Sequence, residues 1–451
     1  MLKDYISFWR EQGHVIDIHA QVESRFEAAA ITAEVQANTN QIVMFHNIQG
    51  HQLPVVMNIY GCRDRLRQMV GAGGPAGPTL SAAINTHITA CLAPAEPFTQ
   101  LDNTQGGDWS PTKLSELPVL TYHEEDAGAY ITSGIVIARD PDSGVHNLSF
   151  HRGMVVSDTE LRISIGPRHD LGRIQQRAED KGQSVDAVFL IGVSPEIFLA
   201  ACTSIPPDAD ELALAAAIKG SSLPMRRSHA LGLDIPVDSD IVIEGRILPN
   251  IRRDEAPFGE WMGNYIEEKQ SHVFEVIHAE RRQDAVFHGL ICGSNEDLRP
   301  LEMATAARIY KTLSAQFSGI IDVTCHPNML CTVVKLKQTY EGQARQVLLA
   351  TISAHFLYSK LCIVVDEDVD IYDLEDVFWA YVTRARPDER TLILGQLPGF
   401  YRDPHKDHWG RLALDATIPW GREHEFRRKS IPGRKAVDLQ ALLAAGPPRS
   451  T

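Results

Sequence analysis

The chain contains 451 residues with a mass of 50.0 kDa; 44% of the residues are hydrophobic and 22% are charged. These proportions are typical of a folded globular protein, and they exclude a disordered, collagen-like or coiled-coil chain. The 43 Lys and Arg residues against 58 Asp and Glu residues leave a net charge of −15, which argues against nucleic acid or an anionic membrane surface as a partner.

The N-terminal sequence and the cysteines indicate the compartment. No apolar run approaches the roughly 18 residues of a membrane span, and MLKDYISFWREQG lacks the apolar segment of a secretory signal. The seven Cys residues include no C-x-x-C pair, and Cys325, His326 and Cys331 alone do not make a zinc site. We therefore expect reduced thiols and a cytoplasmic protein without a membrane span.

Residues 1–116 form the first of three predicted domains, a small α/β unit. Residues 2–13 have the spacing of an amphipathic helix, and residues 41–61 have the pattern of two strands around a Gly-containing turn. The stretch GAGGPAGPT at 71–79 is the richest in Gly and Pro. We expect residues 71–118 to be a connection with some helix rather than a second core.

The second predicted domain, residues 117–300, contains short β-type runs separated by turn signals, from AYITSGIVIARDP to DAVFHGLICG. This texture is typical of a barrel or sandwich, and two helical insertions, at 171–182 and 210–220, interrupt it. Residues 301–451 form the third domain, in which helical and strand patterns alternate as in an α/β layer. The predicted fold class is therefore α/β (α+β).

The segment DEAPFGEWMGNY places two carboxylates, Glu255 and Glu260, five residues apart. In a regular strand such positions face opposite sides, but a turn at Pro257 and Gly259 can direct both toward one cavity. Two carboxylates that share a site have their pKa values pushed apart, which supplies an acid and a base near neutral pH. The alternative is a pair of solvated acidic residues in a turn.

Four further residues could carry chemistry. Asn147 and Arg152 lie five residues apart in strand-like sequence, and a buried Arg152 would need a carboxylate or phosphate partner. His169 precedes a helix, and Glu211 opens the first turn of another. An Asn, a His and a Glu form an oxygen and nitrogen ligand set suited to Mn2+ or Mg2+. The alternatives are an exposed strand arginine, a surface histidine and a glutamate that stabilises its helix N-terminus.

These segments, in this order, resemble the UbiD family of decarboxylases over essentially the whole chain. The matching segments are PVVMNIYGCRDRL, YITSG, the N-x-x-x-x-R of Asn147 and Arg152, IVIEG followed by EAPFGE, KLCIVVDEDVDIYDLEDVFWAYVTR, and LALDAT. The resemblance implies a small N-terminal α/β domain, a central flavin-binding split β-barrel and a C-terminal α/β domain that mediates oligomers. The family's EGPFG reads EAPFG here, so Ala256 adds a methyl group to the catalytic turn.

The resemblance also implies cofactors and partners. The family uses prenylated FMN (prFMN), held through its phosphate by a divalent metal, Mn2+ or Mg2+, with a K+ or Na+ ion nearby. The implied partners are a small-molecule carboxylic acid substrate, a flavin prenyltransferase that supplies the cofactor, and further copies of the chain in a homodimer or homohexamer.

Residue roles follow from the same matches. Asn147, His169 and Glu211 are implied as metal ligands, and Arg152, Glu255 and Glu260 as a catalytic Glu-Arg-Glu network. In this network Arg152 orients the substrate carboxylate, Glu255 holds Arg152, and Glu260 delivers the proton that replaces CO2. The implied cofactor contacts are Thr132, Ser133, Asn147, Arg152, Arg168, His169, Glu211 and Lys360, the last at the phosphate.

The implied activity is the reversible, non-oxidative decarboxylation of an aromatic, heteroaromatic or α,β-unsaturated carboxylic acid, with prFMN as the electron sink. Three alternatives stay open. They are a decarboxylase for a prenylated hydroxybenzoate of quinone biosynthesis, a split-barrel flavin oxidoreductase, and a cofactor-free binding or assembly protein of the same fold. Because no motif fixes the loops that wall the pocket, the sequence does not name the substrate.

Overall fold

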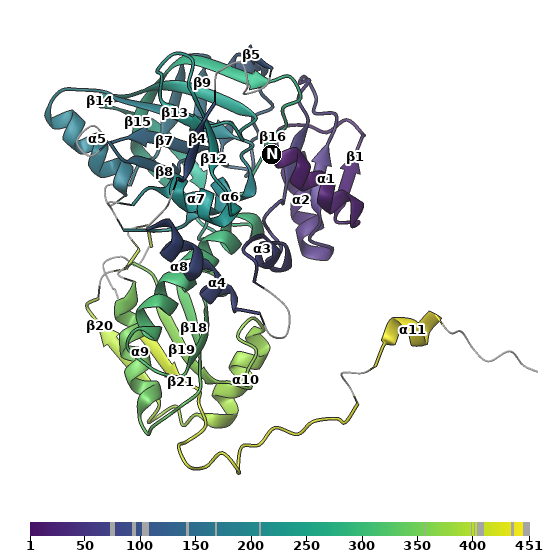
Figure 1. Ribbon diagram of the computed structural model, residues 1–451, viewed down its shortest axis with the longest axis vertical. Helices are drawn as coiled ribbons and strands as arrows, with labels where there is room; N and C mark the ends of the chain where they lie inside the picture. Colours follow the sequence, from purple (N-terminus) through teal and green to yellow (C-terminus); the bar gives the residue numbers. More distant parts are fainter. Residues whose placement is uncertain are drawn as a thin grey trace, which may run out of the picture.

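The computed structural model describes residues 1–72, 77–92, 96–101, 108–140, 144–166, 169–206, 209–355, 357–397, 399–400, 402–403, 410–433 and 437–444. The N-terminal and central elements share one lobe, and the C-terminal elements form a second lobe below it (Figure 1). Two helices, α4 (Leu80–Cys91) and α8 (Asn295–Ser314), lie where the lobes meet. The fold class is α/β, as predicted.

The N-terminal part packs helices on a four-stranded sheet of order β1-β2-β3-β16. Its elements are α1 (Leu2–Glu11), β1 (Val15–Ile18), α2 (Glu27–Asn38), β2 (Ile42–Phe45), β3 (Val55–Met57), α3 (Arg63–Met69), α4 and the distant β16 (Phe287–His288). The predicted first helix and the two strands in 41–61 are confirmed. Helix α2 was not predicted, and the β16 run was expected in the sheet of the central domain.

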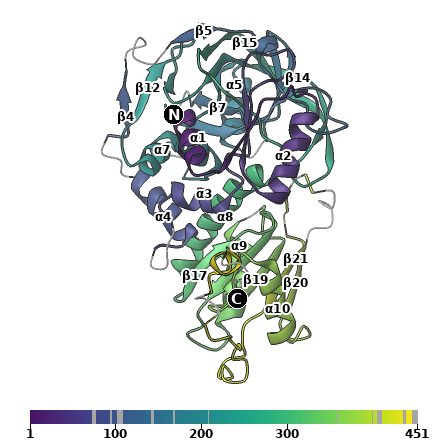
Figure 2. The same cartoon turned by 90° about the vertical axis from the view of Figure 1, so that its right-hand side faces the viewer.

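The central part is built on a nine-stranded sheet that curls into a half-barrel (Figures 1 and 2). The strand order is β6-β9-β10-β15-β14-β11-β7-β8, and β5 pairs with β15. These strands are β5 (Trp109–Pro111), β6 (Tyr130–Ile131), β7 (Ile135–Arg139), β8 (His146–Phe150), β9 (Gly153–Ser157), β10 (Glu160–Ile163), β11 (Val185–Ile191), β14 (Ile241–Gly259) and β15 (Tyr265–Arg282). The β-rich texture was therefore predicted correctly, but two of the strands are 19 and 18 residues long.

Smaller elements surround this sheet. They are β4 (Phe98–Gln100), η2 (Leu114–Glu116), α5 (Asp170–Asp180), α6 (Pro195–Cys202), α7 (Glu211–Lys219), β12 (Leu223–Arg227) and β13 (Asp234–Pro236), with β13-β12-β4 forming a separate sheet. At β7 the nine-stranded sheet is buried on both faces. Along β7, Ile135 and Ile137 belong to one hydrophobic core while Val136 and Ala138 belong to another, as the two-residue period of a strand requires.

The C-terminal lobe is a five-stranded sheet, of order β17-β18-β19-β21-β20, with helices on both faces. After α8 its elements are β17 (Ile320–Thr324), β18 (Cys331–Leu336), α9 (Gln343–Ala354), β19 (Leu361–Asp366), α10 (Leu374–Arg384), β20 (Thr391–Gly395), β21 (Gly410–Asp415) and α11 (Leu439–Ala444). The predicted alternation of helix and strand up to α10 is confirmed. The segment after β21 runs away from the lobe, and α11 lies apart from it (Figure 1).

Glu296, in the first turn of α8, joins three parts of the chain. Its carboxylate accepts the backbone N–H groups of Asn58 and Ile59 at 2.6 and 2.7 Å, and it lies 3.0 Å from Nε2 of His288. The Glu296 and His288 side chains are each 1% exposed. This buried carboxylate therefore fixes the N-terminal part and the strand β16 relative to the helix that leads into the C-terminal lobe.

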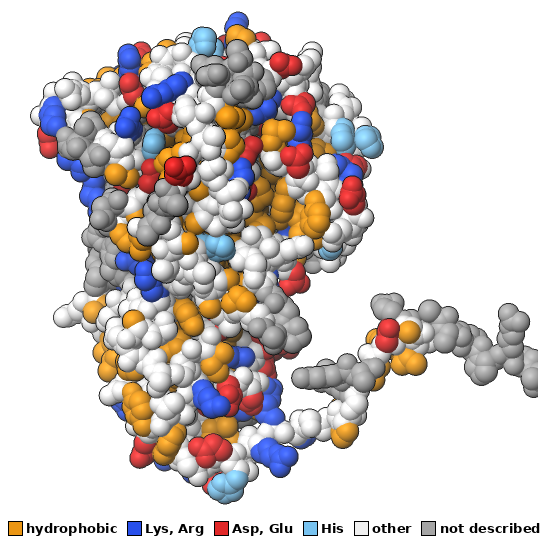
Figure 3. Space-filling view, viewed as in Figure 1, with side chains coloured by type: hydrophobic (Ala, Val, Ile, Leu, Met, Phe, Trp, Pro, Cys, Tyr) orange, Lys and Arg blue, Asp and Glu red, His pale blue; other side chains and the backbone are white. Residues whose placement is uncertain are grey.

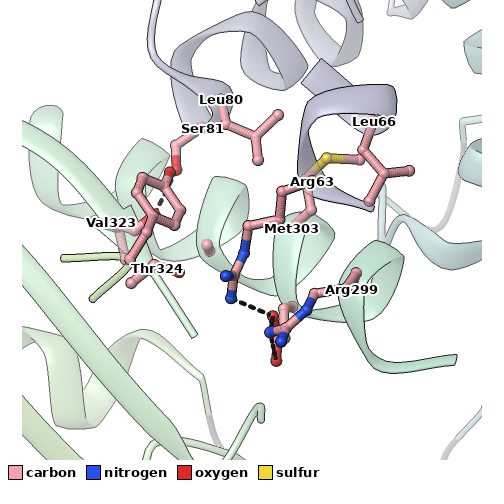
Figure 4. Close-up of a pocket in the computed structure, with 11 residues that line it drawn as sticks. Arg63, Leu66, Leu80, Ser81, Arg299, Met303, Val323 and Thr324 are labelled. Carbon is pink, nitrogen blue, oxygen red and sulfur yellow. Dashed lines mark hydrogen bonds and ion pairs between the residues drawn. The ribbon is translucent and has the colours of Figure 1, made fainter. Parts of the chain in front are cut away.

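A small cavity lies beside this junction, between α3, α4, α8 and the C-terminal sheet (Figure 4). Arg63 and Arg299 point toward each other there, and both donate to Glu302, at 3.2 and 2.7 Å. Burial and the nearby Arg299 lower the pKa of Arg63. The two guanidiniums share one carboxylate, so this cavity serves the contact between the lobes rather than the chemistry considered below.

The surface and the cysteines agree with the composition. On the face drawn in Figure 3, Lys and Arg side chains alternate with Asp and Glu rather than gathering into one basic region. All seven Cys residues are free thiols. In the part of the chain that the structure describes, no helix combines the length and apolar character needed to cross a bilayer.

Candidate active site

Arg152 stands between two glutamates in the turn that joins β8 to β9. Its Nε donates to Glu255 Oε1 at 2.6 Å and its Nη2 to Glu255 Oε2 at 3.5 Å. Its Nη1 donates to Glu260 Oε2 at 3.2 Å. Although burial disfavours the charge, the two carboxylates raise the pKa of Arg152 above its ordinary value. The structure thus brings together the three residues expected to form a Glu-Arg-Glu network.

The local backbone explains how both glutamates reach one arginine, and it differs from the predicted turn. Residues up to Gly259 continue strand β14, and its pairing with β15 changes register on either side of Glu255. Such bulges bend a strand and redirect its side chains. Glu260 follows the last strand residue and lies in the hairpin loop, where its N–H donates to the Asn264 carbonyl at 3.0 Å.

The two glutamates have different surroundings. Glu255 is 0% exposed and also accepts the hydroxyl of Ser271 at 2.6 Å, so it is held by Arg152 and by the neighbouring strand β15. Burial raises the pKa of Glu255, and the Arg152 guanidinium opposes that rise. Glu260 lies on a loop, with the Cys292 thiol 3.9 Å from its Oε1. A fixed carboxylate and a loop-borne carboxylate therefore share one guanidinium.

Arg402 is a site residue that the sequence did not reveal. It belongs to the segment between β20 and β21 of the C-terminal lobe, yet its Nη1 donates to Glu260 Oε2 and its Nη2 donates to Ser164 Oγ at 2.6 Å. No periodicity or motif marks this arginine, because the contact joins residues 142 positions apart in the chain.

Aromatic rings of the C-terminal lobe pack against the loop that joins β14 to β15. Trp261, next to Glu260, has its ring centroid 5.1 Å from that of Phe400 and 6.4 Å from that of Tyr358. Phe258, by contrast, is 1% exposed and packs under Arg152 at 4.4 Å and against Tyr130. Of the apolar residues in this segment, Trp261 therefore faces the other lobe and Phe258 belongs to the barrel core.

The expected metal ligands lie near the opposite end of β8 from Arg152. Glu211 begins α7, and its Oε2 accepts the N–H of Leu148 at 3.2 Å, which places it beside Asn147. Asn147 Oδ1 accepts the Ser149 hydroxyl at 3.1 Å, and that hydroxyl lies 2.9 Å from His151 Nε2.

The third expected metal ligand, His169, lies beside His151, at the end of this series of contacts. The ring centroids of His151 and His169 are 6.2 Å apart. Burial and the positive charge of Arg402 lower the pKa of His169, which favours the neutral imidazole that binds metals. Across the described ranges, no group of three His, Cys, Asp or Glu side chains could hold a metal ion, and this set offers only two such residues plus an amide.

The donor set fits the implied divalent metal. Glu211 is a buried carboxyl, and burial raises its pKa to about 8. A cation at this point would supply the counter-charge that a buried carboxylate requires. The amide, imidazole and carboxylate donors are those that a hard or borderline ion such as Mn2+ accepts.

The remaining expected cofactor contacts are placed as follows. Thr132 donates to the Tyr122 hydroxyl at 2.9 Å, and Ser133 donates to the His288 carbonyl at 2.6 Å, both in the buried interior. Lys360 pairs with Asp403 at 2.5 Å and its side chain is 47% exposed. Arg168 lies outside the described residues. The cofactor-binding roles of these residues stay predictions.

The curled central sheet carries the buried Glu-Arg-Glu network, and the amide, imidazole and carboxylate expected to bind a metal lie toward the other end of β8. Three models of the UbiD family match the chain: the 3-octaprenyl-4-hydroxybenzoate carboxy-lyase N-terminal domain at 6–79, the Rift-related domain at 99–295 and the C-terminal domain at 301–416. The chain therefore belongs to the UbiD family, as its motifs suggested.

Individual relatives agree with this assignment. The chain is 30% identical, over 419 residues, to the anhydromevalonate phosphate decarboxylase of Methanothermobacter thermautotrophicus, and the match covers 92% of this chain and 96% of that protein. The UbiD-class enzyme HmfF from Pelotomaculum thermopropionicum, solved in complex with FMN, superposes with a TM-score of 0.91 at 29% identity, covering 98% and 99% of the two chains. An evolved dimeric form of HmfF with prFMN gives a TM-score of 0.87 at 28% identity, with the same coverage.

Proposed function

We propose that the protein is a prFMN-dependent decarboxylase that removes CO2 from an α,β-unsaturated, aromatic or heteroaromatic carboxylic acid without net oxidation. The observation that carries this proposal is the placement of Arg152 between Glu255 and Glu260, at 2.6 and 3.2 Å. The family and its flavin-containing relatives support it. The reaction converts a carboxylate R–COO− and a proton into R–H and CO2, and it runs in either direction as the CO2 concentration dictates.

Loss of CO2 from an sp2 carbon leaves an electron pair that side chains cannot hold, and prFMN, when bound, supplies the electron sink. Asn147, His169 and Glu211 would hold its phosphate through Mn2+ or Mg2+, with Lys360 as a direct contact. The donor set and the buried carboxyl of Glu211 support this arrangement.

The two glutamates of the network have different tasks: one holds Arg152 in position and the other delivers the proton. Glu255 keeps Arg152 in place because it accepts from two of its nitrogens and from Ser271. Glu260 delivers the proton, since it lies on the loop side of the network and can change its contacts without moving a strand. The aromatic contacts of Trp261 with the C-terminal lobe help to exclude water from this end of the site.

The relatives add one class of candidate substrate. The curated relative named above acts on anhydromevalonate phosphate, a non-aromatic phosphorylated acid. We therefore include a phosphorylated unsaturated acid among the candidate substrates, beside the aromatic and heteroaromatic acids indicated by the family resemblance. We also propose a cytoplasmic homo-oligomer assembled through the C-terminal lobe, where Val382 and Ile393 are 71% and 80% exposed.

The test is a substrate panel with the holoenzyme. The protein is co-expressed with a flavin prenyltransferase, and CO2 release is measured with cinnamate, 2-furoate, 4-hydroxybenzoate and anhydromevalonate phosphate. One CO2 per product with no NAD(P)H consumed is the expected result. Stoichiometric NAD(P)H consumption would favour the split-barrel oxidoreductase, and no CO2 from any acid by the flavin-loaded protein would contradict the proposal.

A further inference from the structure

The loop of residues 122–127, which we call the clasp loop, holds the backbone just before Glu260. The carboxylate of Asp126 in this loop accepts the N–H of Gly259, the last residue of strand β14, at 2.9 Å. Glu260 is the next residue along the chain. Asp126 therefore fixes the backbone one residue before the expected proton donor.

Two further hydrogen bonds join the clasp loop to both strands of the same hairpin. The N–H of Ala127 donates to the Pro257 carbonyl on β14 at 2.8 Å. The N–H of Glu125 donates to the hydroxyl of Tyr265 on β15 at 3.1 Å, and Tyr265 is paired with Gly259 in the sheet. The clasp loop thus contacts the hairpin at the end where its connecting loop begins.

Asp126 is well suited to hold a backbone N–H. Its side chain has no exposed surface, and its Oδ2 accepts the N–H groups of Tyr122 and His123 at 3.3 and 2.8 Å. Although burial opposes the charge, the hydrogen bonds from His123 and Gly259 lower the pKa of Asp126. A carboxylate that accepts several N–H groups is held as the anion, which is a stronger acceptor than a neutral oxygen.

The residue that Asp126 holds is a glycine for a steric reason. The His123 ring packs so closely on Gly259 that a Cβ at this position would lie 2.5 Å from Nδ1 of the ring. Glycine fits there, but glycine also turns about φ and ψ more freely than any other residue. Without the hydrogen bond from its N–H to Asp126, Gly259 would let the loop that follows change direction.

The hydrogen bonds inside the hairpin loop do not set its direction. The N–H of Glu260 donates to the Asn264 carbonyl at 3.0 Å, and the Glu260 carbonyl accepts the N–H of Gly263 at 2.9 Å. These bonds fix the shape of the loop and move with it. The bond from Gly259 to Asp126 instead ties the start of the loop to a segment 133 positions away in the chain.

We propose that Asp126 is a positioning residue that, through the N–H of Gly259, directs the carboxyl group of Glu260 toward the carbon that loses CO2. This inference rests on the proposed decarboxylase function. Because the contact is made to the backbone, it persists while the Glu260 side chain gives up its proton and regains one. A displacement of about 1 Å between reacting groups can cost on the order of 10²-fold in rate, so a small turn at Gly259 is enough to slow proton delivery.

A double-mutant cycle tests whether Asp126 acts through Glu260. It uses the holoenzyme and whichever acid of the panel is decarboxylated. D126N keeps the size of the side chain but replaces one acceptor oxygen by a donor, and kcat should fall about 10–10²-fold with little change in KM or in flavin and metal content. In the E260Q background D126N should have almost no further effect on kcat, because the group that Asp126 positions no longer carries a proton.

Amide hydrogen exchange, followed by mass spectrometry, gives a readout that needs no substrate. The peptide that contains Gly259 and Glu260 should exchange faster in D126N, whereas the peptide of β11 (Val185–Ile191) should keep its wild-type protection. D126E restores an anionic acceptor on a longer side chain, so it should recover part of both the protection and kcat. Unchanged exchange of the Gly259 peptide in D126N would show that Asp126 does not hold the hairpin, and the proposal would be wrong.

The matched control is D240N. Asp240 is also a buried carboxyl of the central part that accepts a backbone N–H, from Val286 at 3.1 Å. This variant should keep the wild-type kcat and the wild-type exchange of the Gly259 peptide.

Three results would overturn the proposal. They are a D126N variant that behaves like D240N, effects of D126N and E260Q on kcat that simply multiply, and a D126N protein that does not fold or does not load flavin, since Asp126 would then serve the fold as a whole. If the wild type decarboxylates no acid of the panel, the proposed function has failed, and the exchange measurement still decides whether Asp126 holds the hairpin.

Discussion

Arg152 Nε donates to Glu255 Oε1 at 2.6 Å, although the two residues lie 103 positions apart. Glu255 has no exposed surface and receives a second hydrogen bond from Ser271 at 2.6 Å. This relationship separates the two glutamates of the site, because Glu255 is locked as a partner of the guanidinium while Glu260 lies in the hairpin loop. The geometry therefore assigns positioning to one carboxylate and leaves the other for proton transfer.

The first prediction concerns that division of roles. Glu260→Gln keeps the shape and a hydrogen-bonding group but removes the transferable proton. We expect decarboxylation, and the incorporation of deuterium from D2O at the reacting carbon, to fall about 10²–10⁴-fold. The variant should still bind flavin and metal, because Glu260 lies away from the expected ligands. Absorbance and elemental analysis measure the loading, and mass spectrometry measures the exchange.

The comparison variant is Glu255→Gln. It should disturb the position of Arg152 and lower turnover, while the remaining activity still exchanges deuterium through Glu260. Near-normal exchange in Glu260→Gln together with lost exchange in Glu255→Gln would reverse the two roles.

A second prediction tests the metal donors. Glu211→Ala removes a carboxylate beside Asn147 that burial holds at a raised pKa of about 8. We expect both metal and flavin content to fall, because the cofactor phosphate would lose its bridging cation. Glu160→Gln, which changes a half-buried carboxylate on β10 that pairs with Arg162, is the control and should keep both. Full flavin content in a metal-free Glu211→Ala protein would show that the metal does not hold the cofactor, and unchanged metal content in that variant would remove Glu211 from the ligand set.

Many helices and strands of this fold could be predicted, because the hydrophobic period within a single segment reveals its secondary structure. Helix α1 buries Leu2, Ile6 and Trp9 on one face, and a helical period reveals such a face. The pairing of β16 with β3 is a different case, because it joins residue 287 to residue 55. Nothing in either short segment specifies which distant strand will be its neighbour.

The site was predicted through motifs, and its omissions have physical causes. Glu255 and Glu260 were expected to converge by a turn, whereas register shifts in β14 redirect Glu255 and the hairpin presents Glu260. A register shift depends on both strands, so one segment does not reveal it. Arg402 was missed because it reaches the site from another lobe, on a segment with no periodic pattern.

A third prediction concerns the buried junction at Glu296. Glu296→Ala would leave His288 and the N–H groups of Asn58 and Ile59 without their acceptor in the interior. Loss of one partner from such a buried network costs about 3–5 kcal/mol. We expect a drop of this order in the free energy of unfolding, measured by urea denaturation. Glu296→Gln keeps one acceptor oxygen and should lose less of the free energy of unfolding. Equal stability of Glu296→Ala and wild type would show that Glu296 does not stabilise this junction.

The last prediction uses Asp240, a carboxyl that is 4% exposed and accepts the N–H of Val286 at 3.1 Å. Burial raises the pKa of Asp240 to about 7, against about 3.9 in an unfolded chain. The folded protein therefore holds this proton more tightly, and the stability that it contributes is present below pH ~4 and is lost as pH rises toward ~7.

Asp240→Asn is neutral throughout and keeps an oxygen acceptor, so it should unfold at higher urea concentration than wild type at pH 8. Its advantage should shrink by up to about 1.4 kcal/mol per pH unit on going to pH 5. Asp284→Asn is the control, because Lys3 lowers the pKa of the exposed Asp284 and the pH dependence should have the opposite sign. A stability difference between Asp240→Asn and wild type that stays constant from pH 5 to 8 would show that Asp240 does not titrate in this range.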